Sequence, residues 1–288
     1  MFANWRQHQT FKRIAKSNRP ILVGPWRSEV GFEALYWLPW LAQWRKTYGI
    51  AKDRIVAISR GGAGAWYDAG RTVDLYDYAP ISSVRRAMLA DSLTTGSVKQ
   101  FALTRQEQTL LPMIAADLGI RRYHVLHPSV MYQQFAPWFD AKMPLGQVTQ
   151  ALDFSTPLLA PFPPLEMPLP QQYLAVSFYA RHTWPMDDER KDWVLALVDG
   201  LSKLLPVVVL ESGLQTDEHV PFPMGSQVLS TAPYCTARNN LAVQSAVLAK
   251  AEAFIGTYGG TMQLAVRLKK PALGFYDRLQ QSGQRLAQ

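Results

Sequence analysis

Short apolar runs alternate with longer amphipathic segments along the first half of the chain. Apolar runs of about four to eight residues between turns are typical of buried strands, and apolar positions recurring every three to four residues are typical of helices. On this pattern, strands are expected at residues 20–23, 53–59, 73–78 and 123–126, and helices at residues 32–48, 82–91, 105–118 and 129–139. The residues before Pro20 form a polar, basic segment that precedes the first predicted strand. This alternation predicts a parallel sheet with helices packed on it.

A proline-rich stretch separates this half from a second one with the same rhythm. Residues 141–171 hold seven prolines, a density that disfavours helices and central strands, and a linker is therefore expected at residues 146–171. Beyond it, strands are expected at residues 173–179, 207–211, 227–230, 253–256 and 272–276, and helices at 187–204, 239–251 and 261–268, with a last short helix after them. We predict an α/β protein of two domains, residues 1–145 and 172–288, whose Rossmann-like parallel sheets face each other across a cleft.

The first predicted strand ends in a turn that is rich in glycine, proline and charge. Ligands of open α/β sheets bind beyond the carboxyl ends of the strands, so we expect Gly24, Trp26 and Arg27 to line a ligand site there. Either Glu29 or Glu33 would supply its carboxylate.

The sequence also predicts roles for other residues near this turn. Arg60 follows the second strand and is expected to face the same site, although the glycines beside it can also serve the turn geometry alone. The rings of Trp26, Tyr36, Trp37 and Trp40 are expected to pack in the core. Pro39 predicts a kink in the helix at residues 32–48 or a late start of that helix.

The segment that ends the 253–256 strand is the most interpretable part of the second half. A buried strand runs into small residues and then a helix, so free backbone N–H groups and the positive end of the helix dipole point at one spot, which favours phosphate. Thr257 and Thr261 could add hydroxyl donors. The segment is neither a dinucleotide fingerprint nor a Walker loop, and an ordinary βα loop is the alternative. The candidate ligand-binding residues are Gly256, Thr257, Tyr258, Gly259, Gly260 and Thr261.

Three further residues are candidates for the same site. Arg181 follows the first strand of the second half, where its guanidinium could bind a diphosphate. His182 is either a site residue or a polar loop residue. Glu211 ends the next strand, at the position where an acidic residue often accepts hydrogen bonds from a ribose. No metal site is expected, and Cys235 is expected to be inert.

Composition narrows the classes of partner. The chain is 48% hydrophobic and carries a formal net charge of +8, which indicates a real core and attraction to anions. No run of five basic residues is present, so nucleic acid is not an expected partner. One cysteine suits a reducing compartment, and no segment has the length and apolarity of a membrane span. We expect a cytoplasmic protein, with any membrane contact peripheral and at the inner face.

Two segments of the second half resemble glycosyltransferases of the GT-B fold. Residues 177–183, Ser-Phe-Tyr-Ala-Arg-His-Thr, resemble the strand and arginine with which fucosyltransferases of the nodulation and protein O-fucosylating type hold the donor β-phosphate, although Tyr179 stands where those enzymes usually have histidine. Residues 245–274 are similar to the donor-site end of those enzymes and of bacterial heptosyltransferases. The heptosyltransferase acid lies about six residues before a proline. Glu33 stands six residues before Pro39, whereas Glu29 lies in the turn itself, and both stay open.

The resemblance implies a metal-independent transferase without a cofactor. It would move a sugar from a nucleotide diphosphate sugar donor, held by the second domain, to a hydroxyl of a glycan or lipid-linked acceptor, held by the first domain. Glu29 or Glu33 would act as the base. Two alternatives stay open: a nucleotide-sugar epimerase of the same fold, and a non-catalytic basic α/β protein that binds polyanions or partners in polysaccharide assembly.

Overall fold

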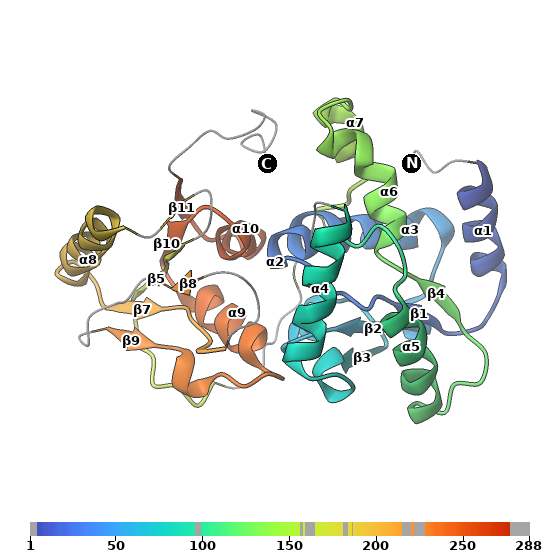
Figure 1. Cartoon of the computed structure of the whole chain (residues 1–288), viewed down its shortest axis with the longest axis horizontal. Coiled ribbons are helices and arrows are strands. Elements are labelled where there is room, and N and C mark those ends of the chain that lie inside the picture. Colours follow the sequence, from blue (N-terminus) through green and yellow to red (C-terminus); the bar gives the residue numbers. More distant parts are fainter. Residues whose placement is uncertain are drawn as a thin grey trace. The chain divides into compact units, whose positions relative to one another are not determined.

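The chain divides into two units, Met1–Ala160 and Pro161–Gln288 (Figure 1). The boundary between them falls inside the segment that was expected to be a linker. The structure is a computed structural model, and it describes residues 5–95, 99–155, 158, 165–180, 184–185, 187–214, 220–221 and 228–276. Each unit has its own parallel sheet, which confirms the predicted α/β fold with two sheets. The predicted cleft between facing sheets stays a prediction.

The first unit is built on a four-stranded parallel sheet with the order β3-β2-β1-β4. Its strands are β1 (Ile21–Val23), β2 (Ile55–Ser59), β3 (Arg71–Asp74) and β4 (His124–Leu126). The chain runs outward from β1 to β3 and then returns to β4 on the other side of β1. This reversal makes a topological switch point between β1 and β4, the place where open α/β sheets bind ligands.

The helices of the first unit follow from these crossovers. Right-handed crossovers in opposite directions place their helices on opposite faces of a sheet. On one face, Leu22 and Ile58 of the sheet share a core cluster with Leu111 and Ile114 of α5. The helices are α1 (Trp5–Lys16), α2 (Val30–Phe32), α3 (Leu38–Tyr48), α4 (Ile81–Thr95), α5 (Arg105–Asp117), α6 (Ser129–Phe139) and α7 (Leu145–Gln150); the short turns are a π-helical turn (Glu33–Trp37) and 3-10 turns at Lys52–Arg54, Ala63–Trp66 and Leu75–Asp77.

Pro39 lies at the start of α3. The residues before it form the π-helical turn Glu33–Trp37, in which the N–H of Leu38 donates to the carbonyl of Glu33. Proline is tolerated in the first turn of a helix because its missing N–H would have had no partner there. The helical backbone nevertheless runs without a break from Val30 to Tyr48, so the helix as a whole does not start late, and the π-helical turn is the irregularity next to the proline.

Two stretches are more helical than the sequence pattern predicted. The polar, basic segment before Pro20 contains the helix α1, in which Phe11 and Ile14 are buried. The rest of this helix has few apolar residues, so the sequence shows no clear helical period of apolar positions. The first residues of the expected linker form α7, because Pro144 precedes that helix and does not interrupt it. Val148 and Ala151 are buried, so this end of the expected linker belongs to the first unit.

The second unit has a five-stranded parallel sheet with the order β11-β10-β5-β7-β9. Its strands are β5 (Leu174–Ser177), β7 (Val207–Val209), β9 (Leu229–Ser230), β10 (Ala253–Thr257) and β11 (Ala272–Phe275); β6 (Tyr179–Ala180) and β8 (Val220–Pro221) form an antiparallel pair, and the helices are α8 (Asp188–Ser202), α9 (Asn240–Lys250) and α10 (Gly260–Arg267), with a 3-10 turn at Ala232–Tyr234. The strand expected at 173–179 is therefore two strands, β5 and β6. The last short helix that was expected lies outside the described residues.

The order of these strands places a second switch point. The chain moves from β5 through β7 to β9, and then returns to β10 and β11 on the other side of β5. The carboxyl ends of β5 and β10 therefore flank the position where an open sheet binds its ligand.

Candidate functional site

The loop after β1 crosses the carboxyl edge of the first sheet in close contact with its neighbours. The N–H of Gly24 donates to the carbonyl of Leu126 at 3.0 Å, and the N–H of Trp26 donates to the carbonyl of Ile58 at 2.9 Å. Gly24 has a φ of +114°, and a Cβ there would collide with the Ile58 carbonyl. Gly24 is thus required by the path of the loop between β2 and β4.

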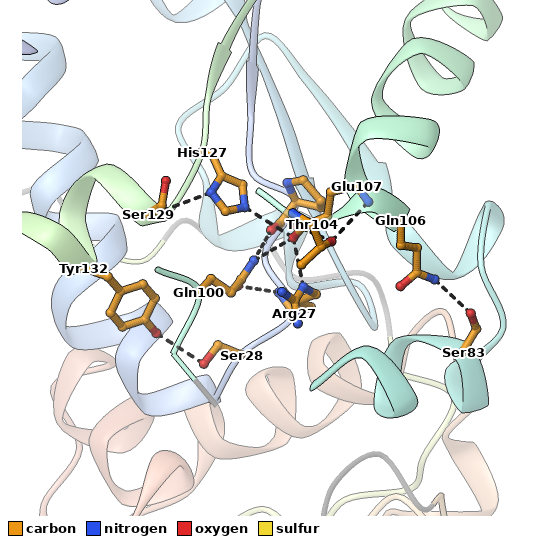
Figure 2. A network of polar contacts seen from close by, with 11 residues as sticks. Arg27, Ser28, Ser83, Gln100, Thr104, Gln106, Glu107, His127, Ser129 and Tyr132 are labelled. Carbon is orange, nitrogen blue, oxygen red and sulfur yellow. Dashed lines mark hydrogen bonds and ion pairs between the residues drawn. The ribbon is translucent and has the colours of Figure 1, made fainter. Parts of the chain in front are cut away.

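Arg27 anchors this loop inside the unit (Figure 2). Its guanidinium Nε–H donates to Oε1 of Glu107 at 2.9 Å, and its backbone N–H donates to the side chain of Gln100 at 3.1 Å. The whole residue is only 1% exposed. Arg27 therefore holds the loop against α5 and does not present its charge at the surface.

Glu107 is the centre of this network. Its carboxylate lies 3.3 Å from Nε2 of His127, the residue that follows β4. The backbone N–H of Ser129 donates to Nδ1 of the same ring, so the imidazole proton is on Nε2. Burial raises the pKa of Glu107, but His127, Arg27 and the N–H of Thr104 outweigh it and hold the pKa at about 2. Glu107 is an ionised anchor across the switch point.

Sequence reasoning missed Gln100 and Glu107. The available signal was a capping box: the Thr104 hydroxyl accepts from the N–H of Glu107, and the Glu107 carboxylate accepts from the N–H of Thr104. That signal predicts where α5 starts. It does not predict that Glu107 binds Arg27, because the two residues are 80 positions apart in the sequence.

Glu33 and Arg60 meet at the same edge of the sheet, as their positions after β1 and β2 indicated. Arg60 Nη1 donates to Oε2 of Glu33 at 2.9 Å. The hydroxyls of Ser59 and Tyr67 each donate to Oε1 of Glu33 at 2.6 Å. Glu33 is fully buried, and burial raises its pKa while Arg60 and the two hydroxyls lower it.

The second arm of the Arg60 guanidinium reaches the loop that carries Glu29. Arg60 Nη2 donates to the carbonyl of Ser28, and the Tyr132 hydroxyl donates to the Ser28 hydroxyl at 3.2 Å. The N–H of Glu33 donates to the carbonyl of Glu29 at 3.2 Å. The side chains of Glu33 and Arg60 thus fix the backbone on which Glu29 stands.

The two candidate carboxylates differ in access. Glu29 is partly exposed and precedes the first residue of α2, whereas Glu33 has no exposed surface. Trp26 is also buried, with its ring stacked on Trp37 at 6.0 Å and on Tyr132 at 5.8 Å between centroids. The predicted packing of the aromatic residues is confirmed, and Trp26 shapes the loop from inside.

The second switch point holds the residues that were expected to bind phosphate. Thr257, at the end of β10, uses its hydroxyl to accept from the N–H of Tyr179 at 3.0 Å and to donate to the Tyr179 carbonyl at 3.2 Å. The N–H of Tyr258 donates to the carbonyl of Phe275. The expected hydroxyl donor at Thr257 is therefore occupied within the protein, because it joins β10 to β6. Thr261 is partly exposed.

The turn into α10 keeps its backbone close to the end of β5. A Cβ at Gly256 would collide with the carbonyl of Ser177, and a Cβ at Gly259 would collide with the Tyr179 hydroxyl. Gly259 is the residue that precedes α10, and the first N–H groups of a helix have no partner within it. The N–H groups of Gly260, Thr261 and Met262 therefore lie at the start of α10, beside the end of β10.

The remaining predicted residues have these positions. Glu211 follows β7, is partly exposed, and accepts from the Ser230 hydroxyl at 2.6 Å. Burial raises the pKa of Cys235 to about 11, as expected for an inert thiol. Arg181 and His182 lie outside the described residues.

The described part of the chain has neither a cluster of metal-ligating side chains nor a membrane-spanning helix. Among those residues, no cluster of three or more His, Cys, Asp or Glu side chains could hold a metal ion. None of the described helices has the length and apolarity needed to cross a membrane.

Solved structures of several glycosyltransferases are similar to this chain. No protein-family model and no curated protein sequence matches it. The heptosyltransferase TibC, described as dodecameric and iron-containing and solved with ADP-D-beta-D-heptose, is 12% identical with a TM-score of 0.44; the match covers 90% of this chain and 58% of TibC. Escherichia coli heptosyltransferase WaaC is 16% identical with a TM-score of 0.41, and the match covers 92% of this chain and 90% of WaaC. A family 9 glycosyl transferase from Veillonella parvula is 11% identical with a TM-score of 0.47, and the match covers 90% of this chain and 80% of that one.

This chain spans 58% of the length of TibC.

Proposed function

We propose that the protein is a glycosyltransferase that moves a sugar from a nucleotide diphosphate sugar to a hydroxyl of a glycan or lipid-linked acceptor, without a metal ion. The observation that carries the proposal is the turn from β10 into α10. It lies at the switch point of the second sheet, where Gly259 precedes α10 and makes room for the Tyr179 hydroxyl beside the start of the helix.

The donor half of the proposal follows from the charge of this turn. Unpaired N–H groups and the positive end of a helix dipole stabilise a phosphate, and they stabilise it more as negative charge grows on the leaving group. In the proposal, the N–H groups of Gly260 and Thr261 bind the diphosphate, with Arg181 adding a cation. Glu211, at the same sheet edge, accepts hydrogen bonds from the ribose.

The acceptor half assigns different roles to the two glutamates of the first unit. A general base must reach the proton that it removes, and Glu29 is the partly exposed one of the pair. Glu29 takes the proton of the acceptor hydroxyl, whose oxygen forms the new bond to the sugar as the bond from the sugar to the diphosphate breaks. Glu33 is a positioning residue, because it holds Arg60 on the carbonyl of Ser28.

The experiment is donor turnover in the presence of EDTA. Nucleoside diphosphate released from UDP-, GDP- and ADP-sugars is measured, with water as a slow acceptor where no glycan is added. One class of donor is expected to release its diphosphate, and Glu29→Gln should lower the rate by about 10² to 10⁴ because general base catalysis is typically of this size.

A matched control is Glu189→Gln, at an exposed position in α8, which should keep the full rate. Turnover that requires added Mg²⁺ would contradict the metal-independent part of the proposal. Full activity in Glu29→Gln would remove Glu29 as the base, and full activity in Glu33→Gln as well would remove any role for this pair of glutamates.

A further inference from the structure

The outward side of α1 carries cations, the uncharged residues Gln9 and Thr10, and one large aromatic ring. Residues 5–19 hold five cationic side chains and no carboxylate, and the first acidic residue of the chain is Glu29. Trp5, Lys12 and Lys16 are spaced seven and four residues apart, so they lie along one face of the helix. All three are exposed, and the Trp5 side chain is 74% exposed.

The opposite side of α1 is committed to the core of the first unit. The ring of Phe11 lies 5.7 Å from that of Trp44 and 5.3 Å from that of Tyr48, between centroids. Ile14 is buried as well. Because this apolar side packs against α3, the helix is fixed with its basic side outward; α1, dark blue in Figure 1, stands on the outer flank of the first unit.

Further cations continue this surface at the amino ends of the strands. Arg54, just before β2, donates from Nη2 to the carbonyls of Ile14 and Arg19 at 2.9 and 3.0 Å. Burial and the nearby charges of Arg19, Arg54 and Arg13 lower the pKa of His124, which places these guanidinium groups around the start of β4. The basic face comprises Trp5, Arg6, Lys12, Arg13, Lys16, Arg19 and Arg54, and the exposed carboxylate of Asp53 lies next to Arg54.

We propose that this basic face is a docking surface for an anionic lipid bilayer. Anionic lipids attract clustered Lys and Arg side chains, and an exposed tryptophan on a basic helix is suited to the boundary between headgroups and acyl chains. Since Phe11 and Ile14 are held in the core, α1 lies on the bilayer and only Trp5 enters it. The basic face lies at the amino ends of β1, β2 and β4, whereas the candidate site lies at their carboxyl ends.

The test is co-sedimentation of the full chain with vesicles. Phosphatidylcholine vesicles containing phosphatidylglycerol are compared with vesicles of phosphatidylcholine alone. The variant Lys12→Gln/Arg13→Gln/Lys16→Gln should lower the partition coefficient on the anionic vesicles on the order of a hundredfold, about fivefold for each charge. Trp5→Ala should lower it as well, and that loss should persist at high salt, which screens only the charges.

The control removes the same number of charges elsewhere. Lys142, Lys203 and Lys250 are exposed, and their triple glutamine variant should bind the anionic vesicles like the unmodified chain. An equal loss in both triple variants, or equal binding to neutral vesicles, would overturn the proposal. Binding to a single-stranded DNA oligonucleotide without binding to the anionic vesicles would also overturn it, in favour of a nucleic-acid surface.

Discussion

Two glutamates four residues apart, Glu29 and Glu33, differ in their surroundings because of one turn of backbone. The π-helical turn begins at Glu33, whose carboxylate is buried and accepts hydrogen bonds from Ser59, Arg60 and Tyr67. Glu29 is partly exposed. The sequence placed Arg60 at the same sheet edge as these glutamates. The sequence could not show which of Glu29 and Glu33 is buried, because the burial of Glu33 depends on its contacts with Ser59, Arg60 and Tyr67 in the folded protein.

The ionised anchor Glu107 predicts a specific dependence of stability on pH. Its pKa is about 2 in the folded protein, against an ordinary value of 4.5. A lowered pKa stabilises the fold above the ordinary value, and this contribution of roughly 3 kcal/mol is lost as the pH falls from about 5 to about 2. Glu107→Gln should therefore lower the free energy of unfolding strongly at pH 7 and roughly half as much at pH 3, measured by denaturant titration.

The control for this prediction is Glu252→Gln, a change at an exposed position, which should have little effect at either pH. A loss of the same size at pH 7 and pH 3 would show that the charge of Glu107 is not what stabilises the loop.

At the scale of elements, the strands and long helices were predicted well because their apolar periods are strong. The helix expected at residues 129–139 is α6 with the same bounds, and β4 differs from its expected strand by one residue. Two misses are α1 and α7, where few apolar residues face the core. A third is the strand expected at residues 73–78, because β3 is Arg71–Asp74 and a 3-10 turn follows it at Leu75–Asp77. The network at the β1–β4 switch point was missed for another reason: its members come from distant elements that only the fold brings together.

Phe11 is the most deeply buried side chain that joins α1 to the first unit. Phe11 is 1% exposed and contacts three aromatic residues of α3. Replacing a buried phenylalanine by alanine typically costs about 3 to 5 kcal/mol, so Phe11→Ala should lower the midpoint of thermal unfolding by several degrees. Trp5→Ala, on the exposed side of the same helix, should leave the midpoint unchanged, and an equal loss in both variants would contradict the packing described here.

At the scale of the whole molecule, each unit repeats one rule. A central strand starts the sheet, the chain builds outward on one side, and then returns to the other. The switch point of the first unit has buried carboxylates, and the switch point of the second unit has a glycine-containing turn before a helix. The switch points follow from the alternation of strands and helices, whereas the contacts among the side chains gathered there do not.

The measurement that tests the central claim most directly is thermal unfolding with UDP, GDP, ADP and CMP, on the unmodified chain and two glycine variants. A ligand at 100 times its dissociation constant stabilises a protein by about 2.7 kcal/mol, so at least one nucleoside diphosphate should raise the midpoint by several degrees. Gly259→Ala, whose Cβ meets the Tyr179 hydroxyl, should lose this response, and Gly200→Ala, with nothing within 4 Å of its Cβ, should keep it. The absence of a response to every nucleotide in the unmodified chain would contradict the account and favour a non-catalytic protein that binds polyanions.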